Sequence, residues 1–139
     1  MIVLDTNVIS EFMLPKPDER VTRWLDRQPS SSLWTSSVTI FEVRFGLETV
    51  PAGRRRTSLM AGFENWLNQV VQQRIVAYDE LAARCAAELA SERQRRGRLG
   101  ELRDTMIAGI VLASRATLAT RNVKHFDDIA SSVVNPWEA

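Results

Sequence analysis

The chain has 139 residues, of which 45% are hydrophobic and 25% are charged, and this predicts one domain over residues 1–139 with a packed core rather than disorder. Its formal net charge of +1 provides no bulk electrostatic argument for nucleic-acid binding. A single cysteine excludes an internal disulfide, no apolar run is long enough to span a membrane, and the start of the chain lacks a secretory h-region, so we expect a cytoplasmic protein.

The chain opens with four apolar residues, which Asp5 follows directly. A short apolar run without polar alternation is typical of a strand buried on both faces of a parallel sheet. In open parallel sheets, ligands bind just beyond the carboxyl ends of the strands. Asp5 therefore occupies a position where such folds place their ligand-binding and catalytic residues. The competing interpretation is that Asp5 only caps a helix expected to begin at Asn7.

The rest of the chain alternates short apolar runs with amphipathic segments, which is typical of an α/β fold. Further strands are expected at 33–35, 75–77, 117–120 and, at an edge, 133–134. Helices are expected at 7–13, after Asp18, from about 36 to 49, and at 55–73, 80–96 and 104–115, with a helical turn at 126–130. Because crossovers between parallel strands are right-handed, these elements predict a parallel sheet of four or five strands with helices on both faces.

Apolar stripes indicate which side chains of these helices form the core. The helix at 55–73 has the stripe Leu59, Phe63, Trp66, Leu67 and Val70, and the helix at 80–96 has Leu81, Cys85 and Leu89. Trp24 and Trp66 lie on such stripes, so we expect both in the core. Gly97 is expected to end the helix at 80–96. The consecutive residues Phe12, Met13 and Leu14 are difficult to bury together and are candidate interface residues.

Polar side chains recur at element boundaries that meet at one edge of such a sheet. Besides Asp5, they are Glu42 in the helix after the second strand, Asp104 before the helix that leads to the fourth strand, and Asn122 after that strand. Each has a local alternative: Thr39 to Glu42 has the spacing of a capping box, Asp104 could cap a helix, and Asn122 could be a turn residue. Because the first and fourth strands usually lie side by side at a switch point, we expect these groups to share one cleft.

Carboxylates gathered in one cleft repel one another, and a divalent cation removes that penalty. Oxygen ligands select hard ions, so Mg²⁺ is expected, with Mn²⁺ as a substitute. The chain has no His-x-x-x-His motif and no pair of cysteines, which argues against a zinc site.

Four blocks of the sequence occur in a familiar order and span nearly the whole chain. They are Leu4-Asp5-Thr6-Asn7, the segment from Ser36 to Gly46, the segment from Asp104 to Gly109, and the segment from Leu118 to Phe126. In these blocks the chain resembles PIN-domain ribonucleases, and more narrowly the VapC-type toxins of bacterial toxin–antitoxin pairs, including the FitB-like members. The resemblance implies a PIN-like three-layer fold and a metal-dependent endoribonuclease. It also implies a small cognate antitoxin protein as partner, and a homodimer.

The resemblance also implies roles for the polar residues. Asp5, Glu42 and Asp104 take the positions of the family's acidic cluster. Asp5 and Asp104 would be the direct metal ligands, and Glu42 would ligate a second ion or act through a bound water. Many relatives carry Asp where this chain has Asn122, so this catalytic position adds no charge here, and whether one or two ions bind stays open.

RNA is the substrate that the resemblance implies, and no nucleophilic side chain is needed if a metal activates water. Arg121 and Thr120 are the expected substrate-binding residues: Arg121 borders Asn122, and the resemblance places Thr120 with Asn122 in the family's last motif. The alternative for Arg121 is an ion pair with one of the site acids. His125 is expected to be a structural or surface residue rather than a catalytic one.

Other enzyme classes of similar architecture are disfavoured, because they require residues that this chain lacks. A haloacid-dehalogenase-type phosphotransferase needs a second Asp where this chain has Asn7, and a response-regulator receiver needs an Asp where Ala77 and Tyr78 end the third strand. A P-loop motif is absent. One alternative from another class stays open because of Asn122: a catalytically weak module that binds RNA or an antitoxin without efficient cleavage.

Overall fold

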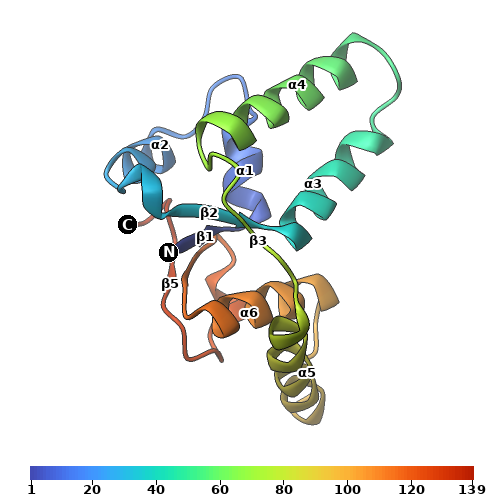
Figure 1. The fold of residues 1–139 in the computed structure, drawn as a ribbon, viewed down its shortest axis with the longest axis vertical. Coiled ribbons are helices and arrows are strands. Elements are labelled where there is room, and N and C mark those ends of the chain that lie inside the picture. Colours follow the sequence, from blue (N-terminus) through green and yellow to red (C-terminus); the bar gives the residue numbers. More distant parts are fainter.

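A five-stranded parallel sheet forms the middle layer of the fold (Figure 1). The computed structural model describes residues 1–139. The strands are β1 (Ile2–Leu4), β2 (Leu33–Ser36), β3 (Ile75–Val76), β4 (Thr117–Ala119) and β5 (Val133–Val134). Their order is β3-β2-β1-β4-β5, and every pairing is parallel. The chain thus moves outward from β1 in one direction and then returns to its other side, which places a switch point between β1 and β4.

Six helices cover the two faces of this sheet, and Figure 1 shows α1 to α4 on one side and α5 with α6 on the other. They are α1 (Thr6–Phe12), α2 (Glu19–Asp26), α3 (Ser37–Thr49), α4 (Arg54–Gln69), α5 (Glu80–Arg95) and α6 (Leu102–Ser114), with 3-10 turns η1 (Ser30–Ser32) and η2 (Val123–Phe126). The predicted three-layer α/β architecture is confirmed. None of these helices combines the length and apolarity needed to cross a bilayer.

Three predicted boundaries differ from the structure by two residues or more. Helix α4 ends at Gln69 instead of residue 73, because the chain turns toward β3 through Gln72 and Gln73, whose φ angles of 49° and 59° are left-handed. Helix α6 begins two residues earlier than predicted, with Glu101 in the N-cap position. The helical turn near the end of the chain is η2, which precedes the predicted range 126–130 almost entirely.

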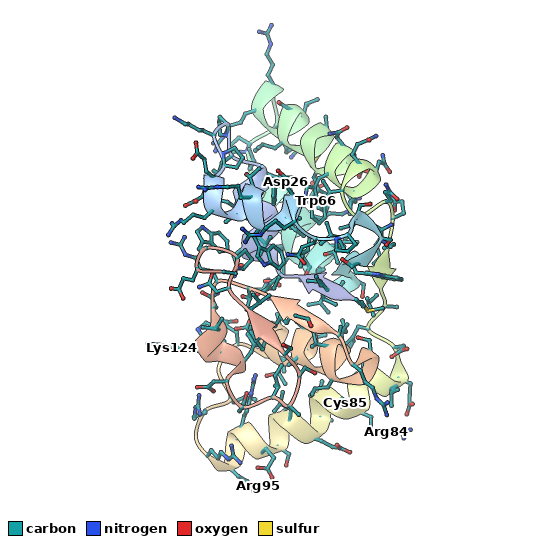
Figure 2. The ribbon with its side chains drawn as sticks, turned by 90° about the vertical axis from the view of Figure 1, so that its left-hand side faces the viewer. Asp26, Trp66, Arg84, Cys85, Arg95 and Lys124 are labelled. Carbon is teal, nitrogen blue, oxygen red and sulfur yellow. The ribbon has the colours of Figure 1, made fainter.

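Two hydrophobic cores lie on opposite sides of the sheet. Because neighbouring residues of a strand face opposite ways, Leu4 packs with α1 to α4 while Val3 packs with α5 and α6, and both are fully buried. Trp24 and Trp66 belong to the first core, as predicted. Figure 2 shows the two layers of side chains, with Trp66 labelled in one and Cys85 in the other. The first strand is therefore buried on both faces.

The predicted apolar stripe of α5 is partly wrong: Leu89 packs against the second core, whereas Leu81 does not. Leu81 is exposed, and the side chains that α5 buries are Ala82, Ala86 and Arg93. These small alanines let α6 approach closely at Gly109. A Cβ placed on Gly109 would lie 2.5 Å from the carbonyl oxygen of Ala82 and 2.7 Å from the Cβ of Ala86. The second core is thus built on a close contact between two helices.

Because of this contact, we expect a glycine-to-alanine substitution to lower the free energy of unfolding in α6 and to raise it in α3. Gly109→Ala is expected to lower the free energy of unfolding by about 2 kcal/mol, because the new methyl group meets the α5 backbone, which cannot swing aside. Gly46→Ala in α3 is the matched control, since a Cβ placed on Gly46 would have no heavy atom within 4 Å beyond its own helix backbone. That variant is expected to gain about 0.5–1 kcal/mol from helix propensity. Urea unfolding measures both values, and a gain in both variants would disprove the close contact.

Candidate active site

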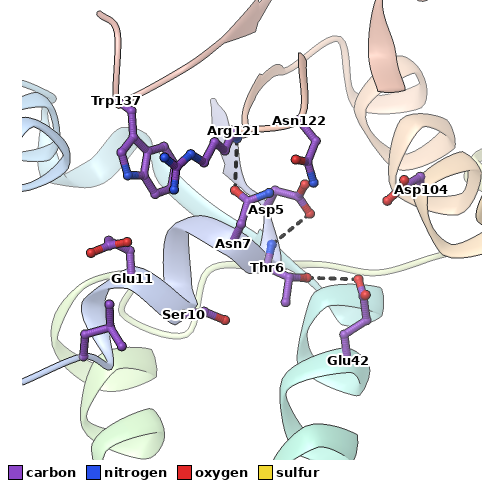
Figure 3. A pocket seen from close by; sticks show the side chains of 11 residues that line it. Asp5, Thr6, Asn7, Ser10, Glu11, Glu42, Asp104, Arg121, Asn122 and Trp137 are labelled. Atoms are coloured by element: carbon purple, nitrogen blue, oxygen red, sulfur yellow. Dashed lines mark hydrogen bonds between the residues drawn. The ribbon is translucent and has the colours of Figure 1, made fainter. Parts of the chain in front are cut away.

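A cleft of about 430 Å³ opens beyond the carboxyl ends of β1 and β4 (Figure 3). The predicted site residues Asp5, Glu42, Asp104, Arg121 and Asn122 all line it. They come from separate places in the chain: the end of β1, helix α3, helix α6, and the segment between β4 and η2. The switch point of the parallel sheet brings them together, as the sequence predicted.

Asp5 is both a helix cap and a cleft residue. Its backbone N–H donates to the Ala119 carbonyl at 2.9 Å, which ties the end of β1 to β4. Its Oδ1 accepts the N–H of Thr6 at 2.8 Å, and its Oδ2 accepts the hydroxyl of Thr120, also at 2.8 Å. The side chain is almost completely buried. The cap and the site are therefore compatible interpretations, because the capping geometry fixes the carboxylate in the wall of the cleft.

The surroundings of Asp5 disfavour its negative charge. Burial raises the pKa of Asp5 to about 6, and the hydrogen bonds from Thr120 and Thr6 oppose this rise. Repulsion from Asp104 and Glu42 adds to it, and no cationic side chain compensates. Asp104 and Glu42 are therefore close enough to disfavour the charge of Asp5, which lacks a positive partner.

Glu42 does not belong to a capping box. The N-cap of α3 is Ser36, whose side chain accepts the N–H of Thr39 at 3.0 Å, so the capping interpretation of Thr39 to Glu42 is wrong. Glu42 lies in the second turn of α3 and points toward the cleft (Figure 3). Its Oε1 accepts the hydroxyl of Thr6 at 3.0 Å, and its Oε2 lies 3.8 Å from Nη1 of Arg103.

Asp104 is the third residue of α6 and not its cap, so the capping interpretation is wrong here too. Its Oδ2 lies 3.0 Å from Nδ1 of His125. His125 is more than half exposed, as expected for a surface residue, yet it contacts a site acid. The sequence carried no signal for this contact beyond the closeness of His125 to Asn122.

Thr120 lies behind Asp5 and not in the cleft wall. It is fully buried, and its hydroxyl donates to Asp5 while it accepts from Nδ2 of Asn7 at 3.2 Å and from the N–H of Asn122 at 3.1 Å. Asn7 in turn accepts the N–H of Arg121 at 3.1 Å through its Oδ1. These bonds connect the start of α1 to the segment after β4. Sequence reasoning missed this role of Asn7, although it adjoins Asp5 and Thr6.

Arg121 stacks on Trp137 instead of pairing with an acid. The carbon at the centre of its guanidinium group lies 4.9 Å from the centroid of the Trp137 ring, which is buried. No ion pair joins Arg121 to a carboxylate of the cleft, so the ion-pair alternative is wrong. Cation–π stacking of this kind leaves the guanidinium N–H groups free at the cleft (Figure 3).

The ligands available to a metal ion are mostly oxygens. No three Asp, Glu, His or Cys side chains converge closely enough to hold an ion by themselves. Mg²⁺ usually binds through one or two carboxylates and keeps several waters, so it does not require such a cage. A buried carboxylate, Asp5, that two other acids repel and no cation neutralises fits this kind of ion. The residues present therefore fit a water-rich Mg²⁺ site that uses Asp5 and Asp104.

Comparisons with known proteins agree on one family. The PIN domain family matches residues 2–131. The VapC ribonuclease Y4jK of Sinorhizobium fredii is 37% identical over 138 residues, which cover 99% of each chain. The toxin FitB of Neisseria gonorrhoeae is 34% identical over 137 residues, again covering 99% of each chain. Among solved structures, that of FitAB bound to an IR36 DNA fragment matches with a TM-score of 0.88 and 34% identity, over 99% of this chain and 96% of that chain.

Proposed function

The chain belongs to the PIN domain family, and from this we propose that it is a Mg²⁺-dependent endoribonuclease, the toxin of a toxin–antitoxin pair. The observation that carries the proposal is the convergence of Asp5, Glu42 and Asp104 on one cleft. Relatives that this chain matches over almost their full length bear the names ribonuclease and toxin. The proposed reaction is hydrolysis of an RNA phosphodiester bond by water, and Mn²⁺ could replace Mg²⁺.

Asp5 and Asp104 would hold the ion, which supplies an activated water and shields charge that develops on the phosphate oxygens. Thr120 and Thr6 hold Asp5 in place, so this carboxylate need not reorganise when the ion binds. Glu42 would act through water, because its Oε1 is anchored by the Thr6 hydroxyl. Asn122 lines the same cleft and offers its amide oxygen as an acceptor without adding charge.

The exposure of a side chain at the cleft decides whether we propose it as a substrate contact. Arg121 is exposed, lines the cleft and has free guanidinium donors, so it suits a phosphate of the RNA. Trp137 positions it by stacking. Thr120 was expected to bind substrate, but its hydroxyl is buried and already bonded. Its proposed role is therefore to position Asp5.

The cognate antitoxin is the proposed partner, and a groove between α1 and α4 is the proposed place for it. This groove of about 360 Å³ is lined by Phe12, Met13, Trp66 and Val70 among others. An apolar antitoxin segment would cover these side chains and remove them from water. Of the three expected interface residues, Phe12 and Met13 line this groove, whereas Leu14 lines the cleft at Asp5.

The homodimer is likewise a proposal, and helix α3 offers a surface for it. Phe41 and Phe45 are 57% and 56% exposed, and their rings stack with centroids 6.0 Å apart. Large apolar side chains exposed together on one helix are typical of a protein–protein contact.

The proposed function predicts that RNA fragments appear only with a divalent ion. Wild-type protein is expected to cut single-stranded RNA with Mg²⁺ or Mn²⁺ and to be inactive in EDTA. Asn122→Asp is expected to bind Mn²⁺ more tightly, because it adds a charged oxygen to the cleft. Gel analysis of RNA and titration of Mn²⁺ by electron paramagnetic resonance measure the two effects. Retention of RNA without fragments at every ion concentration would favour the alternative, a module that binds RNA or the antitoxin without efficient cleavage.

A further inference from the structure

A second cavity, of about 510 Å³, adjoins the cleft and shares only Asp104 with it. Its other walls are the loop from Gly97 to Glu101, between α5 and α6, and the residues Lys124 and His125 of η2. Its volume is in the range of sites that hold small ligands or single nucleotides. An RNA strand that is cut beside Asp104 must extend away from this residue in two directions. The cleft can hold the strand on one side of Asp104, and this cavity can hold it on the other side.

The charges around the cavity leave one free cation. Arg93 pairs with Asp128 at 2.8 Å, and Arg98 pairs with Asp127 at 3.0 Å. Lys124 has no ion-pair partner and is exposed. Three carboxylates line the cavity: Asp128, which pairs with Arg93, Asp104, which contacts His125, and Glu101, which forms no ion pair. Lys124 is therefore the side chain available to an added anion.

Three residues that line the cavity carry backbone donors without a partner. The N–H groups of Leu99, Gly100 and Glu101 have no acceptor within the protein, and all three residues line the cavity. Consecutive unbonded N–H groups suit an anionic oxygen. Lys124 lies on the opposite wall, so both walls of the cavity contain residues with unpaired donors.

A buried side chain keeps these walls together. The guanidinium of Arg93 donates to both carboxylate oxygens of Asp128, to the hydroxyl of Thr105 at 3.0 Å and to the carbonyl of His125 at 2.8 Å. It thus connects α5 with the first turn of α6 and with η2. The cavity is consequently formed before any ligand enters, which lowers the entropy cost of binding.

We propose that this cavity is a second RNA subsite, which holds the sugar–phosphate of a nucleotide next to the scissile bond. Lys124 and the N–H groups of residues 99–101 contact its phosphate. The position of the cut relative to this subsite rests on the proposed function, whereas the binding of RNA to the subsite does not. It places the nucleotide on the side of Asp104 away from Arg121, because Arg121 lines only the cleft.

The chain offers an internal reference for testing this contact, because Lys16 and Lys124 are its only lysines. Both are exposed, and Lys16 lies in the loop between α1 and α2. Asp104→Asn protein, mixed with a short single-stranded RNA, is treated with an amine-acylating reagent and analysed by mass spectrometry. RNA is expected to abolish acylation of Lys124 and to leave acylation of Lys16 unchanged. Equal acylation of Lys124 with and without bound RNA would overturn the subsite.

Kinetics provide a second test with matched variants. Lys124→Gln is expected to raise KM for RNA about 5-fold and to leave kcat unchanged. It should also lower by about 1 the slope of the logarithm of the binding constant against the logarithm of the salt concentration. Lys16→Gln is expected to change none of these quantities. The effect on KM should vanish for a cleavable RNA in which the nucleotide next to the scissile bond on that side carries no further phosphate. Identical KM values for the two variants would refute the subsite even if cleavage is efficient. Protection of Lys124 in the Asp104→Asn protein, together with no cleavage by the wild type, would support the subsite and contradict the proposed nuclease.

Discussion

Asp5→Asn is expected to lower the rate of RNA cleavage by at least about 100-fold, because a neutral amide provides neither the charge nor the basicity that holds a divalent ion. The amide can still accept the Thr6 N–H, so the cap of α1 is retained. Asp104→Asn is expected to act in the same direction. Neither substitution changes the volume of the side chain appreciably, and the fold should persist.

Stability measurements can distinguish this loss of activity from unfolding. In the metal-free wild type, the pKa of Asp5 is raised from 3.8 in the unfolded chain to about 6 in the folded one. Between these values the folded state binds more protons, so the free energy of unfolding falls as the pH rises from about 4 to 6. The two-unit difference corresponds to at most about 3 kcal/mol at neutral pH. Asp5→Asn removes this penalty, so the variant should be at least as stable as the wild type at pH 7 in EDTA.

The measurements are cleavage with Mg²⁺ and urea unfolding across this pH range in EDTA. Glu11→Gln is the matched control, because Glu11 also lines the cleft but its Oε2 only accepts the N–H of Asp18, which an amide oxygen can replace. Its cleavage rate should stay within a few-fold of the wild type. If a folded Asp5→Asn protein cut RNA as fast as the wild type, this would contradict the proposal that Asp5 holds a metal ion needed for cleavage.

Arg93→Met is expected to lower the free energy of unfolding by about 3 kcal/mol, because it leaves a partly buried carboxylate without its partner. The side chains of Arg93 and Asp128 are only 5% and 11% exposed. The hydrogen bond from Arg93 is the main reason why the pKa of Asp128 lies below its usual value. The substitution also removes the bonds to Thr105 and to the His125 carbonyl, on both sides of Asp104. Cleavage should therefore fall as well.

A neighbouring ion pair is the natural control for this prediction. Arg98 and Asp127 also join the end of α5 to the region of η2, but their side chains are 54% and 55% exposed. Arg98→Gln should cost less than about 1 kcal/mol, since solvent screens exposed pairs. The double variant Arg93→Met with Asp128→Leu should recover part of the loss, because no unpaired charge remains. Equal losses for Arg93→Met and Arg98→Gln in urea unfolding would contradict the structural role of the buried pair.

The sequence alone was sufficient for the strands, the parallel architecture and most members of the site. Short apolar runs and capping residues are local patterns, and each defines one element. Parallel strands present their carboxyl ends at one edge, so the polar residues that follow or flank them meet there. Asp5, Glu42, Asp104 and Asn122 could therefore be placed in one cleft without coordinates. Local capping explanations for Glu42 and Asp104 failed because their helices begin earlier than those explanations require.

Only the tertiary structure decided which side chains support this cleft. The contact between Arg93 and Asp128 joins residues 35 positions apart, and the bond between Thr120 and Asp5 joins residues 115 apart. No periodic pattern marks such pairs. A buried arginine is contrary to any prediction from hydrophobicity, because it is buried only where a specific carboxylate compensates its charge. The start of the α5 stripe was misplaced for a related reason: the close approach of Gly109 selects the small Ala82 and Ala86, and Leu81 is exposed. Local patterns thus determine elements, whereas packing and charge compensation between distant elements are settled only when the chain is folded.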